Sequence, residues 1–198
     1  MVQRYHHGDL RAELINEGLR ILNEEGYKAL SLRKVAKACG VSQTAPYRHF
    51  KDKDELVAAI SAEALTSFNR SLEAAATLYA DPRLSLIEIG VAYIRFFAEN
   101  PEYMRFLFMN KEVSAKLEGC SPEEYYKDGH PFATFYNAVS RYKEAFPDEK
   151  LDLNELVLVG WGLVHGIATL LVNGALPNNE DNLNLAEKII RSGNFLKR

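Results

Sequence analysis

The chain has 198 residues, 47% of them apolar and 26% charged, which is enough for one or two globular domains with a buried core. Its two cysteines, Cys39 and Cys120, lie far apart in the sequence, which argues against a disulfide framework and a zinc site. The formal net charge is −3, but residues 26–53 contain seven basic residues and one acidic residue. That segment therefore carries +6 and the remainder −9, a distribution that can direct one face of the protein to phosphates.

The first residues of the chain are mostly polar, and residues 1–8 are expected to form a loose arm. No secretory signal peptide is recognisable there, so we expect a cytoplasmic protein. His6 and His7 are adjacent and do not share a helix face, which favours a weakly cationic arm over a metal site. Helical periodicity then predicts a helix from about Asp9, as N-cap, to residue 25, with Gly26 as its stop.

Two short helices joined by a tight turn are predicted next. Apolar residues at helical spacing predict a helix over residues 32–39, with Ser31 as its N-cap and Gly40 at its end. Ser42 can cap a second helix, from Gln43 to about Phe50. A helix, a short glycine-containing turn and another helix form the helix-turn-helix pattern.

The second of these helices is unusually polar for a structural element. Gln43 can bond adenine through two atoms, and Thr44 can offer a methyl group or a hydroxyl to a base. Pro46 removes little helical bonding near the first turn but discourages a long regular helix. The pattern favours insertion into a DNA major groove, and a solvated surface helix is the alternative interpretation.

Four segments carry a specific resemblance: L-R-K-V-A (32–36), G-V-S (40–42), Y-R-H-F (47–50) and K-D-K-D-E-L (51–56). They resemble the DNA-binding domain of the TetR (tetracycline-repressor-like) family of bacterial regulators. The resemblance implies a homodimer that binds a double-stranded DNA operator and has a C-terminal part that binds a small ligand. We expect base contacts from Gln43, Thr44 and Ala45, phosphate contacts from Ser31, Arg33, Tyr47, His49 and Lys53, and either kind from Arg48.

A long helix is predicted after this motif. Asp52 and Glu55 occupy the positions of a capping box, and an apolar residue at every fourth position supports a helix to about residue 79, before a turn at Asp81-Pro82. We therefore expect a helix-turn-helix DNA-binding domain over residues 1–55, with this helix as a connector. Residues 80–198 are expected to form the ligand-binding and dimerisation domain.

The C-terminal part is rich in aromatic residues and methionine. Residues 84–99 are apolar nearly all round, as in the central helix of a bundle, and residues 102–110 continue this composition. Residues 111–121 are read as a loop, and residues 122–146 as helical with a break at 129–131, where His130 is expected to be exposed. The aromatic residues can line a cavity for an apolar or aromatic effector, and plain core packing is the alternative. The expected ligand contacts are Tyr93, Phe97, Met104, Phe108, Phe135, Tyr136, Trp161 and His165.

Residues 153–172 form the most apolar stretch of the chain. Its uncharged run of 17 residues, from 156 to 172, is shorter than the ~20 residues of a typical membrane span, so we expect no membrane. Gly162 and Gly166 permit close helix contact on one face, which favours a subunit interface. A final helix is predicted from Leu183 to Phe195, with Leu185, Ala186, Ile189 and Ile190 facing inward. Pairing of both helices with those of a second chain gives a four-helix interface, and its expected residues are Gly162, Gly166, Leu170 and Ile189.

Two further patterns are similar to one C-terminal subclass of the TetR family, named for its Trp-His-Gly signature. One is W-x-x-x-H-G at Trp161, His165 and Gly166, and the other is N-P-E-Y-M-R-F-L-F (100–108). Trp161 and His165 lie four residues apart and so share a helix face. His165 is interpreted either as a satisfied structural histidine or as a ligand contact.

No catalytic motif, phosphate-binding loop or metal-ligand spacing was found, so we expect neither an enzyme nor a cofactor or metal ion. The sequence predicts an all-α protein of about nine helices, with a three-helix N-terminal domain and a C-terminal bundle. The function it favours is a dimeric, ligand-releasable repressor of transcription. The alternatives are an activator or architectural DNA binder of the same fold, and a small-molecule-binding protein or enzyme without DNA function.

Overall fold

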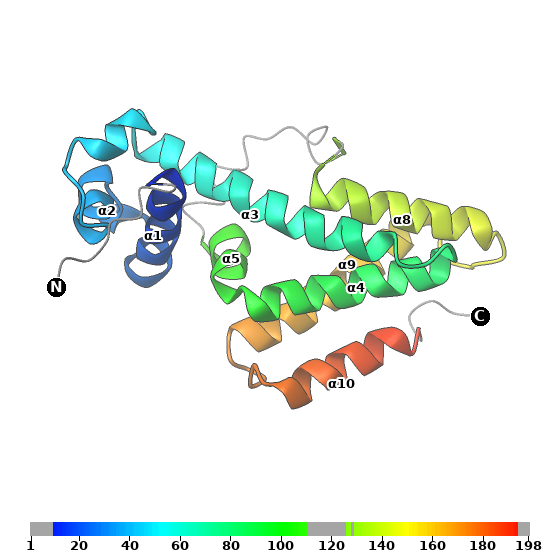
Figure 1. The fold of residues 1–198 in the computed structure, drawn as a ribbon. Helices are drawn as coiled ribbons and strands as arrows, with labels where there is room; N and C mark the ends of the chain where they lie inside the picture. Colours follow the sequence, from blue (N-terminus) through cyan, green and yellow to red (C-terminus); the bar gives the residue numbers. More distant parts are fainter. Residues whose placement is uncertain (1–9, 111–125, 128, 194–198) are drawn as a thin grey trace. The chain divides into compact units, whose positions relative to one another are not determined.

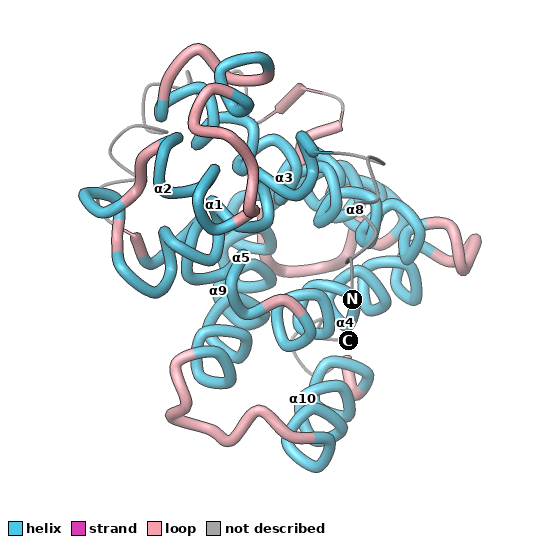
Figure 2. Tube along the Cα trace, turned by 60° about the vertical axis from the view of Figure 1, so that its left-hand side comes forward, coloured by secondary structure: helices cyan, strands magenta, loops and turns pink. Residues whose placement is uncertain are grey.

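The computed structural model describes residues 10–110, 126, 127 and 129–193 (Figure 1). Eight α-helices and three short helical segments occur in this part of the chain, with no strand, so the predicted all-helical fold is confirmed (Figure 2). The chain divides into two compact units. The first contains the described residues up to Ala64 and those from Arg105 to Asn110, and the second contains Leu65–Met104 and the described residues from 126 onward.

The first unit consists of short helices around an apolar core. Helix α1 packs on α2 and η3, and α2 packs on η2. The largest completely or almost completely buried side chains are Phe50, Phe106, Leu14, Ile21, Leu22, Leu56 and Ile60. The elements are α1 (Leu10–Glu25), η1 (Tyr27–Ala29), α2 (Leu32–Ala38), η2 (Ala45–Arg48), the first half of α3 (Lys53–Ala76) and the π-helical η3 (Arg105–Met109).

Both predicted ends of α2 are confirmed. The Ser31 hydroxyl accepts a hydrogen bond from the Lys34 N–H at 3.2 Å, which satisfies one of the free donors of the first turn. Gly40 has a φ of 68°, a left-handed conformation that favours glycine, and the Val41 N–H then donates to the Ala36 carbonyl at 3.0 Å. These local bonds set where α2 begins and where the chain turns toward η2.

The segment after this turn is shorter than predicted. The sequence predicts a helix over residues 43–50 capped by Ser42, whereas the structure contains only the 3₁₀ segment η2. The Ser42 hydroxyl lies 3.2 Å from the Thr44 hydroxyl and caps no helical N–H. Pro46 has no N–H to continue a helical ladder, and its carbonyl accepts from both the His49 and Phe50 N–H groups at 2.9 Å.

Helix α3 begins with the predicted cap. The Asp52 carboxylate accepts the Glu55 N–H at 2.9 Å, while the Glu55 carboxylate accepts from the Lys51 N–H at 2.5 Å. The predicted capping box would have used the N–H of Asp52 itself, so only its first bond is present. The helix ends at Ala76, a few residues before the predicted limit.

The second unit is a bundle with α4 at its centre. Helix α4 packs against α8, α9 and α10, which explains why its apolar side chains cover nearly its whole circumference. Helix α5 contacts α4 and α9, and α8 also contacts α9. The elements are the second half of α3, α4 (Pro82–Glu99), α5 (Pro101–Met104), α8 (Pro131–Ala145), α9 (Leu153–Val172) and α10 (Glu180–Arg191).

Several helix starts differ from the prediction. Asp81 lies in the bend before α4, as predicted, but α4 already begins at Pro82 rather than at about Leu84. The Asp81 carboxylate caps the helix by accepting from the N–H groups of Arg83 and Leu84, at 2.8 and 3.0 Å. His130 is half-buried rather than exposed, since its Nδ1 accepts the Phe132 N–H at 3.1 Å and so caps α8.

The orientation of α10 also corrects a prediction. Leu185 and Ile189 were expected to face inward, but 54% and 45% of their surfaces are exposed. Ala186 and Ile190 are buried as predicted, and Leu183 completes the buried face of α10. The expectations for residues 1–9, 111–125, 128 and 194–198, which include His6, His7, Asp9 and Cys120, lie outside the described residues.

Gly18 of α1 lies close to side chains of α3 and generates a stability prediction. A Cβ atom at this position would lie 3.0 Å from Ile60 Cδ1 and 3.2 Å from Leu56 Cδ2. We expect Gly18→Leu to lower the free energy of unfolding by about 1–3 kcal/mol, because it overpacks this contact. Gly18→Ala should be nearly neutral, because a gain in helix propensity of up to about 1 kcal/mol offsets the crowding. Denaturant titration of both variants measures the difference, and equal stability of the two would contradict the close contact.

Candidate nucleic-acid interface and ligand site

All nine residues expected to contact DNA lie in the first unit and reach its surface. Ala45, His49 and Lys53 are half-exposed. The exposed members are Ser31, Arg33, Gln43, Thr44, Tyr47 and Arg48. Beneath them, Pro46 and Phe50 are buried, so the segment is anchored by apolar packing while its polar side chains face outward. Such an arrangement can present hydrogen-bonding groups to base edges and phosphates.

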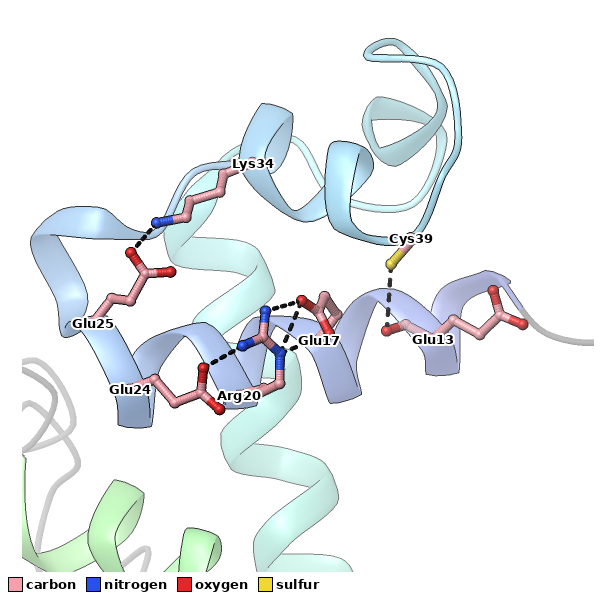
Figure 3. Close-up of polar contacts among 7 residues, drawn as sticks. All are labelled: Glu13, Glu17, Arg20, Glu24, Glu25, Lys34 and Cys39. Atoms are coloured by element: carbon pink, nitrogen blue, oxygen red, sulfur yellow. Dashed lines mark hydrogen bonds and ion pairs between the residues drawn. The ribbon is translucent and has the colours of Figure 1, made fainter.

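Ion pairs within this unit reduce the free positive charge. Lys34 of α2 pairs with Glu25 at the end of α1, and Arg20 pairs with Glu17 and Glu24 along α1 (Figure 3). All of these pairs are at least partly exposed, so each contributes little to stability. Their main consequence is electrostatic, because Lys34 already has an acidic partner before any phosphate arrives.

Cys39 is a packing residue of the same unit. Its Sγ donates to the Glu13 carbonyl at 3.8 Å, and burial raises the pKa of the thiol (Figure 3). A protonated, hydrogen-bonded thiol is a weak nucleophile. Cys39 therefore joins α2 to α1 as a small apolar residue.

A connected cluster of aromatic rings occupies the second unit. Phe68 of α3 is 1% exposed, and its ring centroid lies 4.7–5.1 Å from those of Tyr93, Phe96 and Phe97 on α4. Edge-to-face and tilted arrangements at these distances stabilise such pairs beyond simple area burial. Through Tyr93 this group continues to Trp161 on α9, at 5.3 Å.

A tyrosine–histidine hydrogen bond lies within this cluster. The Tyr93 hydroxyl is 2.8 Å from His165 Nδ1, and the Trp161 and His165 rings stack at 6.5 Å. Burial raises the pKa of the Tyr93 hydroxyl and lowers the pKa of His165. A neutral imidazole whose Nδ1 accepts a hydrogen bond from the neutral tyrosine hydroxyl is consistent with both shifts.

The structure brings most of the predicted ligand residues together. Phe135 contacts Trp161 at 5.6 Å, and Tyr136 joins the cluster through Phe132. Tyr93, Phe97, Met104 and Phe135 are buried, whereas Tyr136, Trp161 and His165 are half-exposed. Phe108 lies in η3, in the first unit, and is 39% exposed. The buried members have the surroundings of core residues, so ligand contact is best supported for the half-exposed ones.

One small cavity borders this cluster. It measures about 10 Å³ and is lined by Leu86, Gly90, Phe135, Val139, Leu156, Val159, Gly160 and Val164. That volume approaches the minimum for a single water molecule and is far below the roughly 300 Å³ of a small-molecule pocket. The cavity is therefore a packing defect beside Phe135 rather than an effector site.

An uncovered apolar face runs along α9. Leu158, Gly162, Gly166 and Leu170 follow one another at every fourth position, and all are exposed. A Cβ atom at Gly162 or Gly166 would meet nothing within 4 Å. Leu185 and Ile189 add exposed apolar surface on α10. Exposed apolar faces on globular proteins commonly mark interaction surfaces.

By length and composition alone, α9 could also cross a membrane, and 33% of its most apolar window is buried. Core and interface helices of water-soluble proteins pass the same test. Helix α9 packs on α4, α5 and α8 and begins with a capping box in which Asp152 and Glu155 bond each other's N–H groups. These contacts belong to a helix of a globular bundle.

Sequence reasoning missed several members of the site. Phe68 was recognised only as part of an apolar stripe, although its ring is the centre of the aromatic cluster. Phe96 and Phe132 also belong to the cluster and were not among the predicted ligand contacts. Their periodicity fits core packing and ring clustering equally well, so spacing alone could not distinguish them. Among the described residues, no group of three or more potential metal ligands was found.

Comparison with known proteins gives matches for both parts of the chain. Residues 14–60 match the family of bacterial regulatory proteins called the tetR family, and residues 86–192 match the tetracyclin repressor-like C-terminal domain. The HTH-type transcriptional regulator AcrR of Shigella flexneri is 38% identical over 52 residues, which are 26% of this chain and 24% of that protein. The class C tetracycline repressor protein of Escherichia coli is 39% identical over 61 residues, 31% of this chain and 27% of that protein.

The chain spans about a quarter to a half of the length of the curated relatives it matches. Among solved structures, a TetR family transcription regulator from Marinobacter aquaeolei VT8 superposes with a TM-score of 0.71. The match covers 92% of this chain and 93% of that chain at 20% identity, which demonstrates a shared fold.

The lowered pKa of His165 predicts a pH-dependent stability. Because the folded state favours the neutral imidazole, the unfolded state binds more protons as the pH falls through the ordinary histidine range. The free energy of unfolding should therefore decrease on acidification from about pH 7.5 to about pH 5.5. A His165→Gln variant should lose less stability than the native protein over the same interval. Denaturant titrations at both pH values test this, and identical losses in the two proteins would exclude His165 as a source of the effect.

Proposed function

Because the chain belongs to the tetR family of bacterial regulatory proteins, we propose that it is a DNA-binding transcriptional repressor that acts as a homodimer. The observation that carries the proposal is the outward polar face of residues 43–49, held on the buried side chains of Pro46 and Phe50. This family consists of regulators rather than enzymes, and its members bind operators as dimers and respond to small molecules.

On this proposal, the surface residues of the first unit divide into two groups. Gln43 and Thr44 contact base edges, with Ala45 beside them, because their side chains supply the donors, acceptors and methyl groups that distinguish base pairs. The group that contacts phosphates comprises Ser31, Arg33, Tyr47, His49 and Lys53, and Arg48 serves either purpose. Phosphate contacts set the position of the protein and not its sequence preference.

Dimerisation is proposed to set the distance between the DNA-binding domains of the two subunits. We place the interface on the exposed apolar face of α9 and α10, which includes Gly162, Gly166, Leu170 and Ile189. Two symmetric subunits would present their recognition segments to successive major grooves, about 34 Å apart on a near-palindromic operator. Burial in the dimer also removes the apolar face from water.

The effector is proposed to be an apolar or aromatic compound that binds beside the half-exposed rings of Tyr136 and Trp161 and the imidazole of His165. We assign the C-terminal part to the Trp-His-Gly subclass, which is supported by the contacts of Trp161 and His165 with Tyr93. We also propose that the DNA-binding domain ends near residue 55 and that the ligand-binding and dimerisation domain begins near residue 80. Because regulators of this family are soluble DNA-binding proteins, we place the protein in the cytoplasm.

Affinity measurements on operator and random DNA should distinguish residues that contact bases from residues that contact phosphates. The purified protein is titrated with the DNA upstream of its own gene and with random DNA, at several salt concentrations and with a panel of apolar compounds. We expect Gln43→Ala to reduce operator affinity by about 1–3 kcal/mol and to relax sequence choice at one position. Arg33→Ala should weaken binding to both DNAs alike and reduce the salt slope by about one.

Release of the operator by one compound of the panel would support the effector assignment. The repressor proposal fails if the native protein prefers no DNA sequence even at low salt, and its inducible part fails if no compound changes the affinity.

Dimerisation through α9 predicts an effect on both assembly and DNA binding. Leu170→Glu should produce a monomer and reduce operator affinity at least tenfold, because a buried charge disfavours the interface and a monomer holds only one half-site. Leu78 is 63% exposed in the connection that follows α3, so Leu78→Glu is a matched control that should stay dimeric. Sedimentation velocity measures the oligomeric state. A dimeric Leu170→Glu protein would place the interface elsewhere.

A further inference from the structure

Lys53 occupies a position where a helix disfavours a cation. It is the first residue of α3, and the positive end of the helix dipole lies at this terminus. The next two residues, Asp54 and Glu55, have the sign that the dipole favours. The helix dipole therefore does not explain a lysine at this position, and contacts outside α3 hold its ammonium group.

Tyr27 provides those contacts from the loop between α1 and α2. Lys53 Nζ lies 3.8 Å from the centroid of the Tyr27 ring and donates to the Tyr27 carbonyl at 3.3 Å. The Tyr27 hydroxyl donates to the carboxylate of Asp54, the neighbour of Lys53. One residue thus binds two consecutive side chains in the first turn of α3, through its ring, its carbonyl and its hydroxyl.

The carbonyl that receives Lys53 is itself fixed. It also accepts the Leu30 N–H at 3.2 Å, which closes the 3₁₀ turn η1, and Leu30 is 2% exposed. The residue after Leu30 is Ser31, the N-cap of α2. Tyr27 is therefore joined through one short turn to the start of α2 and through Lys53 to the start of α3.

We propose that Tyr27 is a positioning residue that holds the Lys53 ammonium ready for a DNA phosphate, an inference that rests on the proposed DNA-binding function. An ammonium has three N–H donors, so the bond to one carbonyl leaves others for a phosphate oxygen. The aromatic face attracts the cation without neutralising it. A free lysine side chain has many rotamers, and ordering it before DNA arrives lowers the entropic cost of binding.

The test is a double-mutant cycle on the full-length protein. The variants are Lys53→Met, which removes the charge and keeps the length of the side chain, Tyr27→Leu, which removes the ring and hydroxyl, and both together. Tyr27→Phe is the matched control, because it keeps the ring and loses only the bond to Asp54. Operator affinity and the salt slope are measured for each, and circular dichroism with thermal unfolding confirms that each variant is folded.

We expect Tyr27→Leu to weaken binding about two- to fivefold, on operator and random DNA alike, which is the strength of an exposed cation–π contact. Tyr27→Phe should change affinity less than Tyr27→Leu does. Lys53→Met should reduce the salt slope by about one, and adding Tyr27→Leu to it should cause no further loss. Upfield ring-current shifts of the Lys53 methylene protons, visible by NMR in the native protein, should disappear in Tyr27→Leu.

Three results would overturn the inference. Unchanged or tighter DNA binding by Tyr27→Leu would show that the ring does not present Lys53. Fully additive losses in the double variant would show that Tyr27 acts by another route. Absent ring-current shifts in the native protein would remove the contact itself. In each of these cases the native protein still binds its operator, whereas a native protein with no affinity for DNA overturns the proposed function as well.

Discussion

The burial of one side of α3 is the constraint on which both units depend. Leu56, Ile60, Ala64, Phe68 and Leu72 recur at every fourth position, and none is more than 1% exposed. The first three belong to the core of the first unit, and the last two to the core of the second. Because fully buried side chains tolerate little displacement, each core fixes its own half of the same continuous helix. The two halves of α3 therefore take part in two different cores.

Phe68 connects the buried side of α3 to the proposed ligand site. Its ring touches Tyr93, Phe96 and Phe97, and Tyr93 in turn touches Trp161 and His165. An effector that moved the half-exposed Trp161 would act on rings already in contact with α3. One polar contact also ties α3 to the bundle, since the Thr134 hydroxyl of α8 donates to the Asn69 side chain at 2.7 Å. Within α3, Asn69 donates in turn to Glu73 at 2.8 Å. A buried hydrogen-bonded side chain such as Asn69 favours one register of packing, because a shifted helix would leave it unpaired.

Most helices could be predicted from the sequence because their signals are local. Ser31, Gly40 and Asp52 mark helix ends through bonds to atoms a few residues away. The predictions failed where the outcome depends on atoms distant in the sequence or on competing local bonds. The apolar periodicity of α10 does not distinguish the face that packs on α4 from the face that is exposed. The sequence therefore predicts that Leu185 and Ile189 face inward, whereas both are exposed. The contact of Tyr27 with Lys53 joins residues 26 positions apart and has no signature in spacing.

The segment proposed to contact DNA bases contains a short 3₁₀ helix, η2, and its conformation depends on tertiary packing. A regular α-helix carries its own ladder of hydrogen bonds, but η2 spans four residues, and Pro46 withholds one donor. The geometry of Gln43 to His49 is therefore dictated by the burial of Pro46 and Phe50 against the rest of the head. The side chains proposed to contact DNA keep their positions only while the core of the first unit stays packed. Unfolding of the first unit should therefore abolish sequence-specific DNA binding at the same time. Protection of η2 amides from solvent exchange consequently reports on the cooperative opening of the whole first unit and not on the fraying of a single helix.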